Sequence, residues 1–258
     1  MIMQLGDPSS SEGKCQGFGP SPLRSGVAGA KAPATDGAVT DIQAFSERAE
    51  IRTYTGNLPH WEQSGTTYFI TFRLGDSLPT GKLRELQNAQ RAWLHAHGLD
   101  DRSQLASLTR EQQRDYHRQF SNVIHQWLDA GHGECTLRRP DCRAIVASAL
   151  QRADGDGFAI GDFVIMPNHV HLLVKPLGKS TLASITQSWK GRSALEINRL
   201  LGRRGAFWQA ESYDHIVRDH DQWVDLAQYI HRNPVKARLP ARDYTLGCGT
   251  LGSPLPPL

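Results

Sequence analysis

The sequence predicts an α+β fold in which helices pack on an antiparallel sheet, and three observations support this prediction. Runs rich in β-branched and aromatic residues occur at 66–74, before Ile165 and at 166–174. Between them lie longer segments whose apolar residues recur at helical spacing, as in Phe120, Ile124, Trp127 and Leu128. Finally, 39% of the 258 residues are hydrophobic, enough for the core of one domain with additions or of two small domains.

Taken in chain order, the expected elements are a strand, three helices, a hairpin of two strands, a helix, a strand and a last helix. The first strand is expected at 66–74 and the three helices at 80–98, 109–130 and about 142–152. The two strands of the hairpin meet at a Pro167-Asn168 turn. The helix, strand and last helix that follow are expected at 180–201, 207–218 and 219–233. Gly65 and Gly75 border the first strand. Ser180 or Thr181 is the expected N-cap of the helix at 180–201. Pro234 is expected to end the last helix just after Asn233.

This order of elements matches a ferredoxin-like antiparallel sheet with helices on one face. The first crossover would carry a helical insert at about 80–153, and the C-terminal helix would bear a tyrosine. The folded domain is expected to span 46–246. Residues 1–45 are rich in Gly, Ser, Ala and Pro and should be disordered. Residues 247–258, which end in GSPLPPL, should form a loose tail.

The run MPNHVHLLV at 166–174 places His169 and His171 on either side of Val170. Residues i and i+2 of a strand point to the same face, so the two imidazoles would project side by side while Val170 points into a core. Histidine is a common ligand of metal ions. The pair therefore indicates either a shared divalent metal or two surface histidines on an edge strand.

The segment DLAQYIHRNPVKARL at 225–239 is expected to be an amphipathic helix. Tyr229 and Asn233 are four residues apart and would lie on one face of its last turns. A phenol can attack phosphorus, and an amide oxygen can bind a hard metal ion. Tyr229 is thus a candidate nucleophile, with a half-buried core aromatic as the alternative.

Composition narrows the possible partners. The net charge is only +3, but 179–204 holds six basic residues and one acid, which indicates a phosphate-binding surface or a solvated helix face. The four cysteines lack CxxC spacing and suggest neither a zinc site nor a disulfide framework. We therefore expect a cytoplasmic protein that has no membrane segment and no signal peptide. That it is a bacterial, nucleoid-associated protein is implied only by the family resemblance described next.

Three groups of residues together resemble a known family. They are the HVH pair; the segment with Phe207-Trp208-Gln209, Tyr213-Asp214-His215 and Val217-Arg218-Asp219; and the YI..NPVKA signature from Tyr229 to Ala237. In this order they resemble the single-tyrosine HUH transposases of the IS200-like kind, and above all the REP-associated tyrosine transposases. The resemblance extends over roughly 50–240 and includes the stretch at 54–74.

The resemblance implies a single-stranded DNA endonuclease and strand transferase that forms a 5′-phosphotyrosine at REP-like hairpins. Tyr229 would be the nucleophile, and His169, His171 and Asn233 would hold Mg²⁺ or Mn²⁺. DNA, as single-stranded segments and hairpins, would be the partner of a monomer or homodimer. The residues expected to contact DNA are Arg52, Asn168, Lys190, Arg192, Arg218, Lys236 and Arg238.

Other readings stay open. The same chemistry would serve an active mobile insertion-sequence transposase, and a catalytically silent DNA-hairpin-binding protein could keep the fold. A metal-dependent hydrolase has less support, because no HExxH or carboxylate-rich motif accompanies the histidines. Trp189 and Trp208 would either stack on DNA bases or pack in the core, as their place in the pattern favours. His215 and His231 would either move protons or lie exposed to solvent, which we expect for both.

Overall fold

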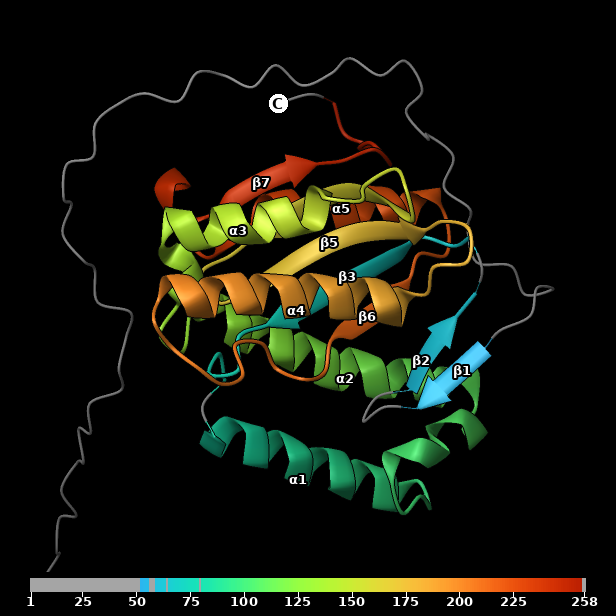
Figure 1. Cartoon of the computed structure of the whole chain (residues 1–258). Coiled ribbons are helices and arrows are strands. Elements are labelled where there is room, and N and C mark those ends of the chain that lie inside the picture. Colours follow the sequence, from blue (N-terminus) through green and yellow to red (C-terminus); the bar gives the residue numbers. More distant parts are fainter. Residues whose placement is uncertain (1–51, 56–58, 64, 79, 257–258) are drawn as a thin grey trace, which may run out of the picture.

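The computed structural model describes residues 52–55, 59–63, 65–78 and 80–256 (Figure 1). Its strands are β1 (Arg52–Thr55), β2 (Pro59–Glu62), β3 (Tyr68–Arg73), β4 (Phe158–Ile165), β5 (His169–Pro176), β6 (Tyr213–Ile216) and β7 (Thr245–Cys248). Its α-helices are α1 (Thr80–Ala96), α2 (Arg110–Asp129), α3 (Pro140–Gln151), α4 (Leu182–Leu200) and α5 (His220–Lys236). Short 3-10 helices are η1 (Arg102–Ser107), η2 (Thr136–Arg138) and η3 (Ala241–Asp243). The segment 1–45 lies outside the described residues.

The central sheet has five strands in the order β6-β3-β5-β4-β7, and every neighbouring pair is antiparallel. Strands β3, β4, β5 and β6, together with the crossover helices α3 and α4, form the βαββαβ arrangement of a ferredoxin-like fold. This confirms the fold class that the sequence predicts. Within β4 the register shifts between Ile160 and Phe163, which is a β-bulge.

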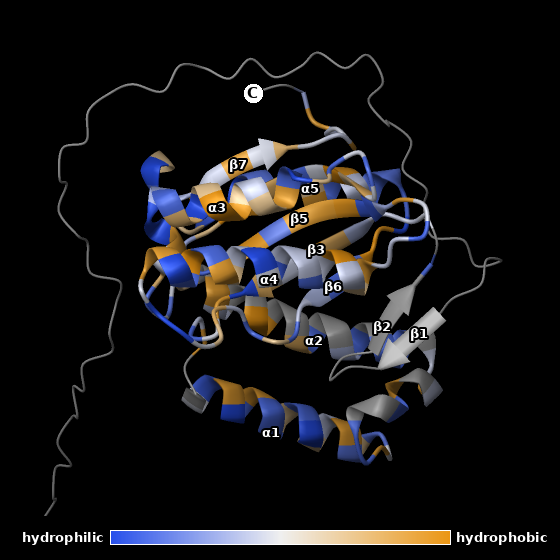
Figure 2. Cartoon of the chain, viewed as in Figure 1, coloured by the Kyte–Doolittle hydropathy of each residue, from blue (hydrophilic) through white to orange (hydrophobic). Residues whose placement is uncertain are grey.

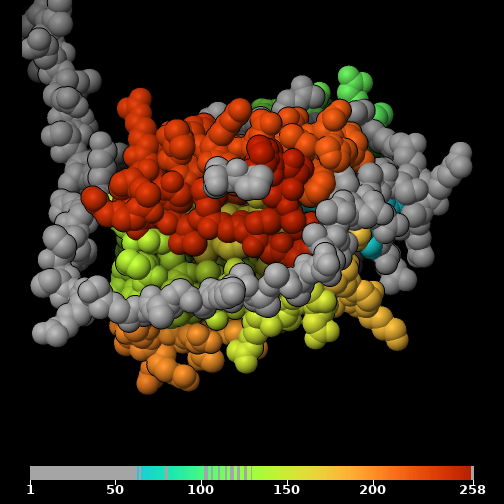
Figure 3. All heavy atoms as spheres, turned by 90° about the horizontal axis from the view of Figure 1, so that it is seen from above, coloured from blue at the N-terminus to red at the C-terminus, as the bar shows by residue number. Residues whose placement is uncertain are grey.

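The two faces of the sheet are covered by different helices. Alternating residues of β3 and β5, such as Ile70, Phe72 and Val170, pack on one face in a core shared with α3 and α4. Phe69 and Leu173 point to the other face, where they pack with α5. Seen from above, α3 and α4 lie on one side of the molecule, and the red and red-orange C-terminal part of the chain that follows α4 lies on the other (Figure 3). The sheet is therefore covered on both faces, and α5 packs on the face opposite α3 and α4, together with Tyr244 and Leu255 from the chain that follows it.

The insert in the first crossover is shorter than predicted. Helices α1 and α2, with η1, form a separate apolar cluster that includes Leu94, Tyr116 and Phe120, and they lie beside the sandwich (Figures 1 and 2). Helix α3 contributes Val146 and Leu150 to the main core. It is thus the crossover helix itself, and the part of the predicted 80–153 insert beyond α2 was assigned wrongly.

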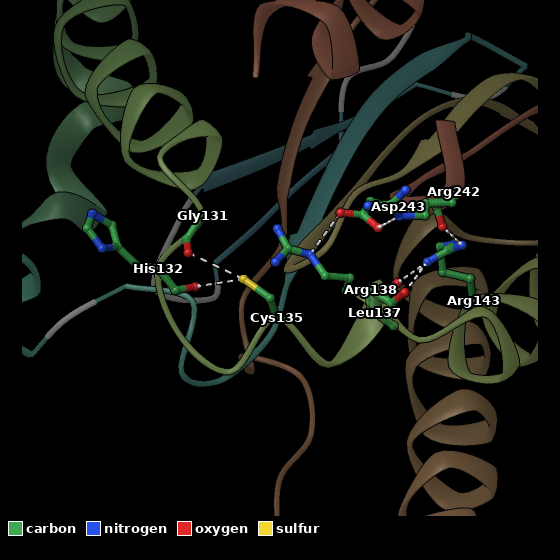
Figure 4. Close-up of polar contacts among 8 residues, drawn as sticks. All are labelled: Gly131, His132, Cys135, Leu137, Arg138, Arg143, Arg242 and Asp243. Carbon is green, nitrogen blue, oxygen red and sulfur yellow. Dashed lines mark hydrogen bonds and ion pairs between the residues drawn. The ribbon is translucent and has the colours of Figure 1, made fainter. Parts of the chain in front are cut away.

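Described residues of the C-terminal segment, from β7 to Leu255, pack against the sheet, in contrast to the loose tail expected for 247–258. Strand β7 pairs with β4, and Leu251 is fully buried with its N–H bonded to the carbonyl oxygen of Ile160. Arg143 of α3 helps to hold this region, because its guanidinium donates to the carbonyl oxygens of Leu137, Arg138 and Arg242 (Figure 4). The long-range pairing with β4 fixes a segment that has little strand character of its own.

Three other boundaries differ from the prediction. An additional hairpin of β1 and β2 precedes the strand expected to be first. The predicted strand 207–218 is regular only over Tyr213–Ile216, although Trp208 still bridges to Leu74. Helix α5 continues through Pro234 to Lys236, because a proline in the last turn removes only one hydrogen bond and the N–H of Ala237 bonds to the carbonyl of Asn233.

Candidate metal and tyrosine site

The two histidines of the HVH run lie on the same face of β5, as the strand alternation predicts. Their Nε2 atoms are 3.0 Å apart, and both side chains are fully buried. They are therefore not surface residues of an edge strand, since β5 is the middle strand of the sheet. Two imidazole nitrogens that bind one ion at about 2.1 Å, with an angle near 90°, are separated by about this distance.

Asn168 fixes the orientation of the first imidazole. Its Oδ1 lies 2.7 Å from His169 Nδ1, while its Nδ2 donates to the carbonyl oxygens of Leu128 and His132 at 3.3 and 3.1 Å. Because two carbonyls take the amide N–H groups, Oδ1 must be the atom that accepts from His169. Nδ1 then carries the proton, which leaves the lone pair of Nε2 for a metal ion.

The second imidazole is held from β3. His171 Nδ1 lies 2.7 Å from Thr71 Oγ1, and the ring stacks on Phe69 with centroids 5.4 Å apart. Thr71 and His171 are Cα partners in the register of β3 and β5. The hydroxyl can accept from Nδ1, which again directs Nε2 toward the other histidine.

Helix α5 brings the tyrosine to this pair. The Tyr229 hydroxyl lies 3.5 Å from His171 Nε2, and its ring packs edge-on to Phe69. The helix is amphipathic and buries Trp223, Ala227 and Ile230 against the sheet. Tyr229 is half-buried, so it faces the site with its polar atom while its ring helps to close the core.

Asn233 lies one helical turn beyond the tyrosine. It is 1% exposed, and neither its Oδ1 nor its Nδ2 has a hydrogen-bond partner. A buried amide without partners is unusual, because each unpaired polar group is costly. Within the part of the chain that the structure describes, no cluster of three or more His, Cys, Asp or Glu side chains could hold a metal ion. Asn233 is the residue that the sequence predicts as the third ligand beside the two histidines, and this prediction stays untested.

Two further histidines flank the site, and neither is exposed as we had expected. His231 Nε2 lies 2.8 Å from Oδ1 of Asp162, which is buried on the β4 bulge. His215 faces Gln222 at 2.9 Å, and burial, followed by the charge of Arg218, lowers the pKa of its imidazole. The contact between His231 and Asp162 joins α5 to β4 close to Tyr229.

The residues expected to contact DNA are spread over the molecule. The side chain of Arg52 lies outside the described part, while Arg192, Arg218, Lys236 and Arg238 are exposed. Arg192 lies on α4, across the sheet from α5.

Two of these residues are engaged internally. Asn168 is buried at the histidine pair, so its side chain is not offered to DNA, and a positioning role replaces the predicted contact. Lys190 is half-buried and donates to the carbonyl oxygen of Ala210 at 2.6 Å. Burial lowers the pKa of Lys190 from 10.5 to about 8.

A groove of about 510 Å³ runs between α4 and the segment 205–214, and its lining includes Lys190 and Trp208. Trp189 and Trp208 are both buried, with Trp208 Nε1 donating to Ser193 Oγ. They pack in the core, as the sequence pattern favours, and are not stacking platforms.

Comparison with known proteins now places the domain. Residues 138–233 match the family model described as transposase IS200 like, and this segment contains both histidines, the tyrosine and Asn233. This segment of the chain is thus similar to the IS200-like transposases, the family that the motifs resemble. Described residues include no helix that is long and apolar enough to span a membrane.

Two individual proteins are similar to this chain. An uncharacterized protein of Haemophilus influenzae is 29% identical over 97 residues, which cover 30% of this chain and 54% of that protein. This chain therefore spans about half the length of that relative. A solved structure of a REP-associated tyrosine transposase bound to a REP hairpin is 18% identical, with a TM-score of 0.31, and covers 67% of this chain and 68% of its own.

Proposed function

We propose that this protein is a metal-dependent endonuclease and strand transferase for single-stranded DNA that acts at REP-like hairpins through a 5′-phosphotyrosine intermediate. The observation that carries the proposal is the meeting of two elements far apart in the sequence. The Nε2 atoms of His169 and His171 are 3.0 Å apart, and the Tyr229 hydroxyl lies 3.5 Å from the second of them. A nucleophile beside a pair of metal-binding nitrogens is suited to phosphoryl transfer.

The residues of the chain would divide the chemistry as follows. His169, His171 and Asn233 would hold Mg²⁺ or Mn²⁺, which when bound supplies a Lewis acid for the phosphate oxygens. Tyr229 forms the new bond from its oxygen to phosphorus, while the bond from phosphorus to the 3′ oxygen breaks. The phenolic proton is lost to solvent, and the leaving 3′ oxygen takes up a proton. A later 3′-OH can reverse the attack and join strands without external energy.

DNA as the substrate is supported by the family match and by the exposed basic residues. The same chemistry would serve a mobile insertion-sequence transposase or a chromosomal enzyme at REP-like hairpins. Inverted repeats beside the gene would favour the chromosomal enzyme. Gene copies with fixed terminal hairpins would favour a mobile element.

The nucleophile can be tested with a matched pair of tyrosines. Tyr213 of β6 is the Cα partner of Thr71 and so lies near the same face of the sheet, which makes it a fair rival. We expect Tyr229→Phe to abolish the covalent protein–DNA adduct on a denaturing gel, while hairpin binding stays within threefold. Tyr213→Phe should keep the adduct. An adduct that survives Tyr229→Phe would contradict the proposal, and hairpin binding by the wild type with no adduct would favour a catalytically silent binding protein.

The metal site can be tested separately. His169→Ala should abolish cleavage in Mg²⁺ and leave hairpin affinity largely intact, because most affinity for DNA comes from backbone contacts elsewhere. If cleavage and binding fall together, the histidines contact DNA or stabilise the fold instead.

A further inference from the structure

Arg73, the last residue of β3, lies beside the histidine pair. Its Cα partner across the sheet is His169, just as the Cα partner of Thr71 is His171. Because Thr71 reaches His171 with its hydroxyl, alternation along the strand places the Arg73 side chain on that same face. Side chains that are direct cross-strand partners start with Cβ atoms about 4.5–5.5 Å apart. The side chain of Arg73 thus starts next to the first of the two histidines, on the face of the sheet that carries both.

Arg73 is partly buried, yet its polar contacts leave its charge uncompensated. Its Nη1 donates to Ser77 Oγ at 3.1 Å, and that hydroxyl in turn donates to the carbonyl oxygen of Leu74. Within the described part of the chain, no carboxylate forms an ion pair with this guanidinium. Burial lowers the pKa of Arg73 to about 10, and no neighbouring anion raises it.

Burial of a guanidinium is unfavourable without a counter-charge. An anion held by Arg73 would supply that counter-charge. Arginine has five N–H donors in a planar fork that matches the non-bridging oxygens of a phosphate.

We propose that Arg73 binds a phosphate of the DNA strand that lies across His169 and His171, with two of its N–H groups donated to the non-bridging oxygens. This inference rests on the proposed function, because it takes DNA as the substrate. It adds a residue that is not among the DNA-contacting residues expected from the sequence. Its place on β3 also explains why a charged residue ends an otherwise apolar and threonine-rich strand.

The test uses Arg73→Gln and Arg73→Lys in the full chain, with Arg84→Gln on the exposed face of α1 as the matched control. Single-turnover cleavage should slow by about 10²–10³-fold in Arg73→Gln, the range for loss of one oxyanion-binding donor. Arg73→Lys should recover part of the rate, because it keeps the charge and loses the fork. The control should cleave at the wild-type rate. A rate for Arg73→Gln within threefold of wild type would overturn the inference.

Binding is measured separately in a Tyr229→Phe background, so that it does not depend on cleavage. The slope of log affinity against log salt for single-stranded DNA should fall by about 0.7 in Arg73→Gln, the value for one phosphate contact. Neutral methylphosphonate is then placed at one phosphate at a time. At the phosphate that Arg73 binds, the methylphosphonate and Arg73→Gln together should weaken binding no more than either change does alone.

The outcomes separate the two proposals. If the fold-losses of DNA affinity caused by the methylphosphonate and by Arg73→Gln multiply at every position, Arg73 contacts no phosphate. This conclusion holds even if Tyr229 forms its adduct. If the losses fail to multiply at one position while the wild type forms no adduct, the phosphate site stands and the proposed nuclease function falls. Should Arg73→Gln be unfolded at the assay temperature, the same comparison is made with Arg73→Lys, for which a multiplying loss at every position again overturns the inference.

Discussion

The amide of Asn168 joins the end of α2 to the histidine pair, and its removal gives a prediction with two separable parts. In Asn168→Ala, His169 Nδ1 and the carbonyls of Leu128 and His132 lose the partners they have at 2.7, 3.3 and 3.1 Å. Each unpaired buried polar group costs about 1–3 kcal/mol. Since the two longer bonds contribute less, we expect the free energy of unfolding to fall by about 2–4 kcal/mol. Metal affinity should fall about 10–100-fold, as for other partners that orient a ligand histidine.

Asn168→Asp separates these parts. A carboxylate still accepts from His169 Nδ1, but it cannot donate to the two carbonyls and is repelled by them. We therefore expect this variant to lose stability while it binds metal within about threefold of wild type. Asn198→Ala on α4 is the control, because its amide also donates to a backbone carbonyl, that of Gly205, away from the site.

The assays are urea unfolding and titration with Mn²⁺ followed by calorimetry or electron paramagnetic resonance. Wild-type affinity in Asn168→Ala would refute the idea that this amide orients the ligand histidine. Equal loss of affinity in Asn168→Ala and Asn168→Asp would refute the division into an acceptor that serves the metal site and donors that serve the fold.

Two further predictions concern stability. Because burial lowers the pKa of Lys190 from 10.5 to about 8, the folded protein releases this proton before the unfolded chain does, and the free energy of unfolding should rise between pH 8 and 10.5. Lys190→Met should remove that part of the rise in urea unfolding, whereas exposed Lys179→Met should keep it; an unchanged profile for Lys190→Met would show the pKa to be ordinary. A Cβ at Gly247 would lie 2.3 Å from the buried ring of Phe163, so Gly247→Ala should destabilise the protein by about 1–3 kcal/mol. Gly191→Ala in α4, where a Cβ meets nothing within 4 Å, should stabilise it slightly, and equal effects at the two glycines would mean that β7 is not packed on Phe163.

The main elements could be predicted from the sequence because their periodicity is local. The helix spacing of Phe120 and Leu128 and the alternation around Val170 both survive in the structure. Strand β7 could not be predicted, because its four residues include a glycine and gain their order from pairing with β4. The assignment of α3 to the insert failed for a similar reason: periodicity shows that a helix exists but does not show which core it joins.

The same contrast between local sequence patterns and long-range contacts applies to the site. Spacing alone placed His169 with His171 and Tyr229 with Asn233. The groups that orient these residues come from remote parts of the chain, since Thr71 lies 100 residues before His171. The side chain of Arg73 has one signal in the sequence, a charge at the end of the run TTYFITFRL, but its meaning depends on the register with β5.

The path of the chain around the tyrosine helix has a consequence for assembly. Helix α5 follows the edge strand β6 and precedes β7, which is the strand at the opposite edge of the sheet. Both ends of the helix are therefore connected to strands of its own domain. A domain swap that placed α5 on a second copy would require β7 to separate from β4 and Leu251 to leave the core. If Tyr229 is the nucleophile and His169 and His171 bind the metal, as proposed, all three belong to one polypeptide, and the rate of adduct formation per chain should not change on dilution.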